Sequence, residues 1–194
     1  MQIDPLYIYV FFGLLSPGPN VILLTASGAR FGFLPTLPHI LGVAVGVGVT
    51  AGLTGFGIGA LLLARPSLEF ALKCLAAAWI LYMAYTLWRS TASKVASEKD
   101  RPFTFVEAVL FQWVNPKVWA VALSASSAYA AGWTPIWEAA RLGSAFSGIN
   151  LFVCISWTFA GTLLSFLLSN PSAWRVFMRI MAVALGSFAV LIFL

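Results

Sequence analysis

Long apolar runs recur along the whole chain, and they constrain the fold more than any motif does. A run of about 18 or more apolar residues marks a membrane-spanning helix. Six such runs follow one another between breaks, at Leu6–Ser27, Leu37–Ala64, Phe70–Trp88, Phe105–Ala128, Ser144–Ser169 and Trp174–Phe193. Charged residues make up only 9% of the 194 residues, whereas a soluble domain is about 25% charged. We therefore expect an all-α integral membrane protein with six transmembrane helices.

Two of the predicted spans are interrupted by proline. The first span contains "SPGPN", in which Pro17, Gly18 and Pro19 precede Asn20, and the fourth contains Asn115-Pro116-Lys117. Pro116 follows Pro17 by 99 residues in a chain of 194, so each half opens with a broken span. With three spans in each half, the second half must enter the membrane in the opposite direction. The sequence thus predicts an inverted 3+3 repeat with broken first and fourth helices, which is typical of secondary transporters.

The basic residues predict the orientation and the boundary between the halves. The linkers after spans one, three and five hold more Lys and Arg than the other side, namely Arg30, Arg89, Lys94, Lys99, Arg101, Arg175 and Arg179. The positive-inside rule makes this side cytoplasmic and both termini extracytoplasmic. Residues 1–93 then form the first repeat, 94–102 a polar cytoplasmic linker and 103–194 the second repeat. The net charge of +5 follows from topology and contact with anionic lipid, so we expect no nucleic-acid partner.

Each break can start a new half-helix, because proline is well tolerated at a first helical position after a capping residue. In the inverted arrangement both starts would offer free N–H groups and partial positive charge near mid-bilayer, which suits a carboxylate. Lys117 adds a full charge that costs at least ~2.5 kcal/mol within the membrane. Its expected partner is a substrate carboxylate or a carboxyl group from another span; the alternative is an ammonium group that extends to the interface. A Pro-Gly-Pro on its own is also compatible with a simple kink.

Three amides expected at membrane depth complete the candidate substrate-binding set of Pro17, Gly18, Pro19, Asn20, Asn115, Pro116, Lys117 and Asn150. Asn20 and Asn115 either hold an amino group or satisfy backbone carbonyls that the breaks set free. Asn150 is a further candidate in span five. The glycines of span two predict close helix packing, against another span or a second subunit.

The sequence offers little basis for enzyme chemistry. It contains one histidine, two isolated cysteines and no paired carboxylates within the spans. We can assemble no metal site, haem site or acid–base pair from these residues, so we expect no cofactor and no catalytic residue. His39, at the start of span two, is expected to form hydrogen bonds at the interface.

These motifs resemble those of a known family. The lysine exporter and homoserine–threonine resistance (LysE/RhtB) superfamily has a similar opening to "SPGPNVILLTASGARFGFLPTLPHILGVAVGVGV", with a Pro-Gly-Pro in the first span and a Gly-rich second span. Its fourth span resembles "TFVEAVLFQWVNPKVWAVALSA". The tail "INLFVCISWTFAGTLLSFL" looks closest to its cysteine/O-acetylserine branch. The resemblance implies a bacterial inner-membrane exporter of an amino acid or related metabolite, driven by a proton or cation gradient and usually homo-oligomeric. Span two lacks the acidic residue of many relatives, which is compatible with a neutral zwitterion as substrate.

The paired breaks in an inverted repeat predict a secondary transporter, and the family resemblance implies that it exports an amino acid or a related metabolite. A membrane channel or a regulatory membrane scaffold without coupled transport is the alternative. A channel would pass substrate only down its gradient, whereas a coupled exporter would move it against one.

Overall fold

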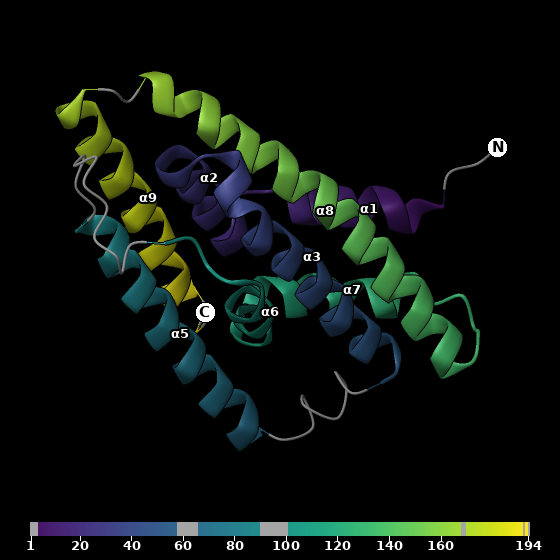
Figure 1. Ribbon diagram of the computed structural model, residues 1–194. Helices are drawn as coiled ribbons and strands as arrows, with labels where there is room; N and C mark the ends of the chain where they lie inside the picture. Colours follow the sequence, from purple (N-terminus) through teal and green to yellow (C-terminus); the bar gives the residue numbers. More distant parts are fainter. Residues whose placement is uncertain (1–3, 58–65, 90–100, 168–169, 192, 194) are drawn as a thin grey trace.

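The computed structural model describes residues 4–57, 66–89, 101–167, 170–191 and 193, and all of its regular structure is α-helical (Figure 1). Eight helices lie in these ranges: α1 Pro5–Leu15, α2 Pro19–Phe31, α3 Phe33–Gly55, α5 Pro66–Trp88, α6 Phe105–Val114, α7 Pro116–Ala128, α8 Pro135–Leu167 and α9 Pro171–Leu191. The end of the predicted second span and most of the predicted linker 94–102 lie outside the described residues.

Three of these helices are long and apolar enough to cross a membrane by themselves. They are α3, α8 and α9, with mean hydropathies of 1.5 to 1.6 over their most apolar windows. The pair α1 and α2 also qualifies as one span, bent by 57° at its break. The helix α8 contains the predicted fifth span but starts at Pro135, before the span's predicted start at Ser144. Polar residues in its first turns find partners there, so the helix extends beyond the apolar run.

Both predicted breaks are present, and each ends one helix and begins another. At the first, α1 ends at Leu15 and Pro19 is the first residue of α2. At the second, α6 ends at Val114 and Pro116 is the first residue of α7. Proline lacks the N–H that a helix interior requires, but that group is unpaired anyway at a first helical position. The prolines therefore set where the second helix of each pair starts.

The glycines of α3 are used for packing within the chain. A Cβ built on Gly42 would lie 2.4 Å from the carbonyl oxygen of Phe105 in α6. One built on Gly48 would lie 2.9 Å from the carbonyl oxygen of Gly143 in α8. Small residues let helix backbones approach this closely. The glycines of α3 thus pack against helices of the same chain, which is one of the two kinds of partner expected for this span.

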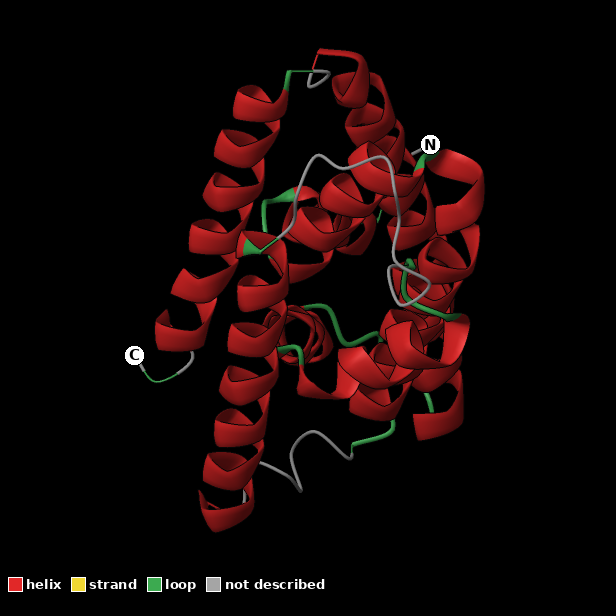
Figure 2. Cartoon of the chain, turned by 60° about the vertical axis from the view of Figure 1, so that its left-hand side comes forward, coloured by secondary structure: helices red, strands yellow, loops and turns green. Residues whose placement is uncertain are grey.

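The helices pack in a reciprocal pattern. α3 contacts α6 and α7, while α8 contacts α1 and α2, and α3 and α8 contact each other along their length. α5 and α9 form a second pair that lies beside this group, as Figures 1 and 2 show. Large apolar side chains such as Phe12, Leu34 and Val183 remain more than half exposed, as expected of helices whose outer faces meet lipid.

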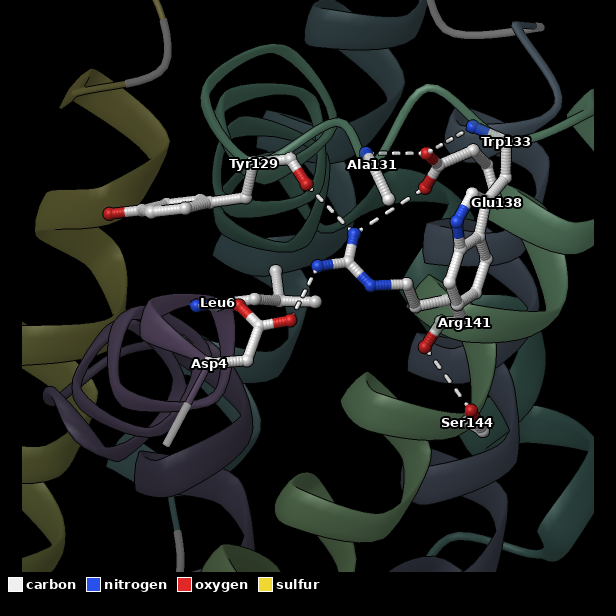
Figure 3. Close-up of polar contacts among 8 residues, drawn as sticks. All are labelled: Asp4, Leu6, Tyr129, Ala131, Trp133, Glu138, Arg141 and Ser144. Carbon is white, nitrogen blue, oxygen red and sulfur yellow. Dashed lines mark hydrogen bonds and ion pairs between the residues drawn. The ribbon is translucent and has the colours of Figure 1, made fainter. Parts of the chain in front are cut away.

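The helix before each break is anchored at its start by an acid and an arginine. Asp4 caps α1 by accepting from the N–H of Leu6 at 2.9 Å, and its other oxygen lies 2.6 Å from an Nη of Arg141 in α8 (Figure 3). Arg141 also donates to the carbonyl of Tyr129, and Glu138 lies beside it. These contacts tie the start of α1 to the start of α8.

The corresponding anchor of α6 is a capping box. The hydroxyl of Thr104 accepts from the N–H of Glu107 at 3.2 Å, and the Glu107 carboxylate accepts from the N–H of Thr104 at 2.8 Å. Arg101 donates to both oxygens of that carboxylate at 2.7 Å. Reciprocal bonds of this kind satisfy donors that a helix start leaves unpaired.

Candidate binding site between the two helix breaks

A narrow cavity lies between the two breaks and is lined by residues of both halves of the chain. It includes Gly18 and Asn20 of the first break, Asn115 and Lys117 of the second, and Asn150 of α8. Five of the eight residues predicted to bind substrate are thus brought to one place. Apolar side chains of α1, α2, α7 and α8 complete the wall. We refer to this space as the narrow cavity.

The other three predicted residues do not line the narrow cavity. Pro17 is exposed, and Pro19 and Pro116 occupy the first positions of α2 and α7. Their effect on the site is indirect, because they determine where those helices begin. The sequence motif therefore combines residues that shape the backbone with residues that face the cavity.

Lys117 connects the two breaks. Its ammonium group donates to the backbone carbonyl of Ser16, at the end of α1. A Cβ on Gly18 would lie 2.6 Å from Cδ of Lys117, so glycine at this position leaves room for the lysine side chain. The sequence predicts a carboxylate partner, from the substrate or another span, or an extension to the interface. Within the described residues the ammonium group bonds a carbonyl that the first break leaves without a helical donor.

Asn20 is held by a residue that sequence reasoning missed. Its Nδ2 donates to Oε1 of Gln112 at 2.8 Å, and Nε2 of Gln112 donates in turn to the carbonyl of Ala108 at 2.8 Å. Because Gln112 must donate to that carbonyl, its oxygen faces Asn20, and Asn20 must present its own NH₂ group. The Oδ1 atom of Asn20 is buried without a hydrogen-bond partner among the described residues.

Asn115 ends α6 and caps α7 at the same time. Its Oδ1 accepts from the N–H of Lys117 at 3.2 Å, and its backbone carbonyl accepts from the N–H of Val118 at 3.1 Å. The first donors of α7 are therefore already paired, contrary to the expectation that both helix starts would be free. The Nδ2 of Asn115 remains buried and unpaired in the described part of the chain.

α8 contributes two further polar groups. Asn150 is 3% exposed, and its Nδ2 has no hydrogen-bond partner within the described ranges. The same holds for Nε1 of Trp157, which also lines the narrow cavity. Trp157 follows Asn150 by seven residues, or about two helical turns, which is the sequence signal that places both on one face. Unpaired buried polar groups cost about 1–3 kcal/mol each.

The narrow cavity thus combines a cation, three N–H donors and one acceptor. Lys117 is the cation, Asn115, Asn150 and Trp157 supply the three donors, and Asn20 supplies the acceptor. A carboxylate accepts hydrogen bonds from donors such as these, and an ammonium group donates hydrogen bonds to acceptors. The volume is about 20 Å³, which is enough for about one water molecule. An amino acid requires a wider arrangement of the same helices. No group of three or more His, Cys, Asp or Glu residues in the described ranges is arranged to hold a metal ion.

Comparison with known proteins gives a consistent result. The family model described as LysE type translocator matches residues 11–194. An uncharacterized membrane protein of Vibrio cholerae is 33% identical over 108 residues, which cover 53% of this chain and 52% of the relative. A second one, from Pseudomonas aeruginosa, is 32% identical over 117 residues, covering 56% and 54%. The chain thus spans about half the length of these two relatives.

A third relative carries a functional name. The cysteine/O-acetylserine efflux protein of Salmonella paratyphi A is 29% identical over 131 residues, which cover 66% of each chain. No solved structure matches the chain. Because the family model covers nearly all of the sequence, including both helix breaks, the chain belongs to the LysE type translocator family.

Proposed function

We propose that the protein is a secondary transporter that exports a small, uncharged amino acid or a related metabolite from the cytoplasm. The observation that carries the proposal is the narrow cavity, where Gly18, Asn20, Asn115, Lys117 and Asn150 meet from both halves of the chain. The substrate carboxylate lies against Lys117 and the unpaired amide donors, and its ammonium group against Oδ1 of Asn20. The efflux relative supports this substrate class.

The transport cycle follows from the size of the cavity. At about 20 Å³ it does not hold an amino acid in the observed arrangement. Substrate binding therefore requires the helices around the breaks to separate, and alternating access opens the site to one side at a time. Movement of a proton or cation down its gradient drives the cycle.

The proposal includes the full topology. Six spans form two inverted repeats, residues 1–93 and 103–194, in a bacterial inner membrane with both termini outside. The reciprocal contacts of α3 and α8 with the helix pairs of the opposite half support this arrangement. A homo-oligomer is part of the proposal through the family resemblance.

The decisive experiment is counterflow in proteoliposomes with labelled cysteine, O-acetylserine, serine and lysine. We expect exchange of the uncharged amino acids and little exchange of lysine, because the narrow cavity offers no acidic side chain among its lining residues. Accumulation of amino acid against its own concentration gradient supports coupled export if an ionophore, which collapses the ion gradient, abolishes it. Flux that only follows the gradient would support the channel alternative, and no flux of any amino acid would overturn the proposal.

The topology has a separate test. A single cysteine placed at position 94, in a chain in which Cys74 and Cys154 are replaced by serine, should resist a membrane-impermeant thiol reagent in intact cells. A cysteine at position 4 should react in the same assay. The opposite labelling pattern would invert the orientation without affecting the binding site.

A further inference from the structure

A second, wider cavity lies on another face of α2. It has a volume of about 340 Å³ and is lined by α2, α3, α5 and the start of α6. Asn20, Val21 and Leu24 of α2 line the narrow cavity, while Leu23, Ser27 and Arg30 line the wide cavity. α2 is therefore part of the wall of both spaces. Binding pockets for small molecules usually have volumes of about 300–1,000 Å³, so the wide cavity has the size of a binding site.

A buried histidine faces the wide cavity without a partner. His39 is 2% exposed, and neither of its ring nitrogens has a hydrogen-bond partner in the described residues. Its ring packs against that of Phe103, with centroids 5.0 Å apart. The sequence had led us to expect a hydrogen-bonding residue at the interface. A neutral imidazole has one donor and one acceptor, and burying both unpaired is costly unless a ligand or water occupies the cavity.

The charges and rings around His39 indicate the kind of ligand. Arg30 lines the wide cavity, as do Arg101 and Glu107, the one acid among its described lining residues, which pair with each other. Trp79 and Tyr82 of α5 also line it, with ring centroids 5.9 Å apart. Guanidinium groups bind carboxylates, and the faces of aromatic rings bind ammonium groups. Together these groups match both charged ends of an amino acid.

We propose that the wide cavity is a second binding site for a zwitterionic amino acid, through which the substrate reaches the narrow cavity. The carboxylate lies toward Arg30 and His39, and the ammonium group lies toward the rings of Trp79 and Tyr82. The proposal rests on the proposed export function, since it names the site that the same substrate occupies first. Transfer to the narrow cavity then requires a displacement of α2, which lines both.

Two tryptophans allow the two cavities to be observed separately. Trp79 lines the wide cavity and Trp157 lines the narrow cavity. We suggest ¹⁹F NMR of protein labelled with 5-fluorotryptophan in lipid nanodiscs, with the two resonances assigned through Trp79→Phe and Trp157→Phe. L-Serine is the probe. We expect a saturable shift of the Trp79 resonance that persists in Asn115→Asp, a variant that alters only the narrow cavity.

The variants separate a direct contact from a distant effect. His39→Phe keeps the ring but removes both nitrogens, and Arg30→Gln removes the charge; each should weaken the Trp79 response at least about tenfold. Lys73→Gln removes a charge from α5 outside the cavity and should leave the response unchanged. Unchanged melting temperatures of the variants show that the fold is intact. If His39→Phe is unstable, the Trp79 response of Arg30→Gln alone tests the direct contact.

The outcomes distinguish this inference from the proposed function. If Trp79 does not respond while Trp157 does, the wide cavity is not a binding site and export through the narrow cavity stands. If Trp79 responds while Trp157 does not and no transport occurs, the narrow site fails and the wide cavity remains a binding site. Loss of the Trp79 response to serine in Asn115→Asp would overturn the inference. So would a Trp79 shift that depends on the phosphatidylglycerol content of the nanodisc and not on the serine concentration.

Discussion

The two helix breaks have similar sequences but different local structures. At the first, three residues separate α1 from α2, Gly18 is the residue before α2, and no side chain caps the new helix. At the second, Asn115 alone joins α6 to α7, and its own side chain and carbonyl bond the first N–H groups of α7. The first break therefore leaves an open helix start, whereas the second is closed.

The difference assigns separate roles to the breaks. The open start of α2 offers backbone donors and partial positive charge, and the carbonyl of Ser16 is left to accept from Lys117. The second break supplies side chains instead, the ammonium group of Lys117 and the free amide donor of Asn115. A matched pair of motifs thus yields an asymmetric cavity, and under the proposed function this asymmetry fits the two unlike ends of a zwitterion.

Removal of the charge from the second break should have the largest effect. Lys117→Ala is expected to lower amino-acid exchange about 10- to 100-fold, since a hydrogen bond to a charged group is worth about 1.5–3 kcal/mol. Initial rates of counterflow measure this. Ser16→Ala is the control, because the Lys117 bond is made to the backbone of Ser16 and survives the change. Normal exchange by Lys117→Ala would remove lysine from the site.

The capping and binding roles of Asn115 can be separated. Asn115→Asp keeps a good N-cap but replaces the free donor by an acceptor, so stability should change little while exchange falls about tenfold. Asn115→Ala loses the cap as well and should cost about 1 kcal/mol of stability in addition. Thermal unfolding in detergent and counterflow provide the two measurements. Equal exchange in wild type and Asn115→Asp would show that the amide donor has no part in binding.

The link between the first break and α6 is accessible through a double-mutant cycle. Asn20→Ala leaves Oε1 of the fully buried Gln112 without its donor, which should cost about 1–2 kcal/mol. In a protein that already carries Gln112→Ala, Asn20→Ala should lower the free energy of unfolding by about 1 kcal/mol less than it does in the wild type. Chemical unfolding of the four proteins measures the coupling. Strict additivity would mean that this bond contributes nothing to stability.

Gly18 has no side chain, and this leaves room at the first break for the side chain of Lys117. Gly18→Ala would place a Cβ within 2.6 Å of Cδ of Lys117. The lysine side chain can move aside, so we expect little change in stability but a severalfold loss of exchange. Gly148→Ala in α8 is the matched control, since a Cβ there meets nothing within 4 Å. Equal exchange by both variants would show that the position of Lys117 is not critical.

The anchor of α1 should have the smallest effect. Hydrogen bonds from Arg141 and from the backbone of Leu6 hold the pKa of Asp4 below its usual value of 3.8. A lowered pKa stabilises the fold above that value, and this contribution disappears as the pH falls through the folded-state pKa. Because Asp4 is 38% exposed, the contribution is below about 1 kcal/mol. The difference in melting temperature between wild type and Asp4→Asn should therefore shrink in acid; a constant difference would exclude the ion pair as its cause.

Several features of the fold and the site were predictable because they depend on local chemistry. Proline cannot continue a helix interior, so Pro19 and Pro116 predicted the starts of α2 and α7. The apolar runs predicted membrane-spanning helices, three of which stand alone in the structure. Lys117 and the amides were candidates because polar groups at membrane depth require a partner. The expected inversion of the two halves predicted that the two breaks would lie close together, and residues of both breaks line the narrow cavity.

Other features depended on contacts between distant segments. Nothing near Lys117 in the sequence indicates that its partner is the carbonyl of Ser16, 101 residues away. Gln112 and Trp157 gave weak signals, because a polar residue or a tryptophan in an apolar helix has many possible surroundings. The wide cavity was not predicted at all, since α2, α3 and α5 form it only when packed together.

The sequence by itself determined the membrane setting, the helix breaks and the family, because these follow from composition, from proline chemistry and from motifs at fixed spacing. Only the tertiary structure decided which break is closed by its own side chain, which buried amide atoms stay free and where a second cavity forms. Hydrogen-bond partners and cavities are properties of packed helices, and packing brings together groups that no local pattern connects.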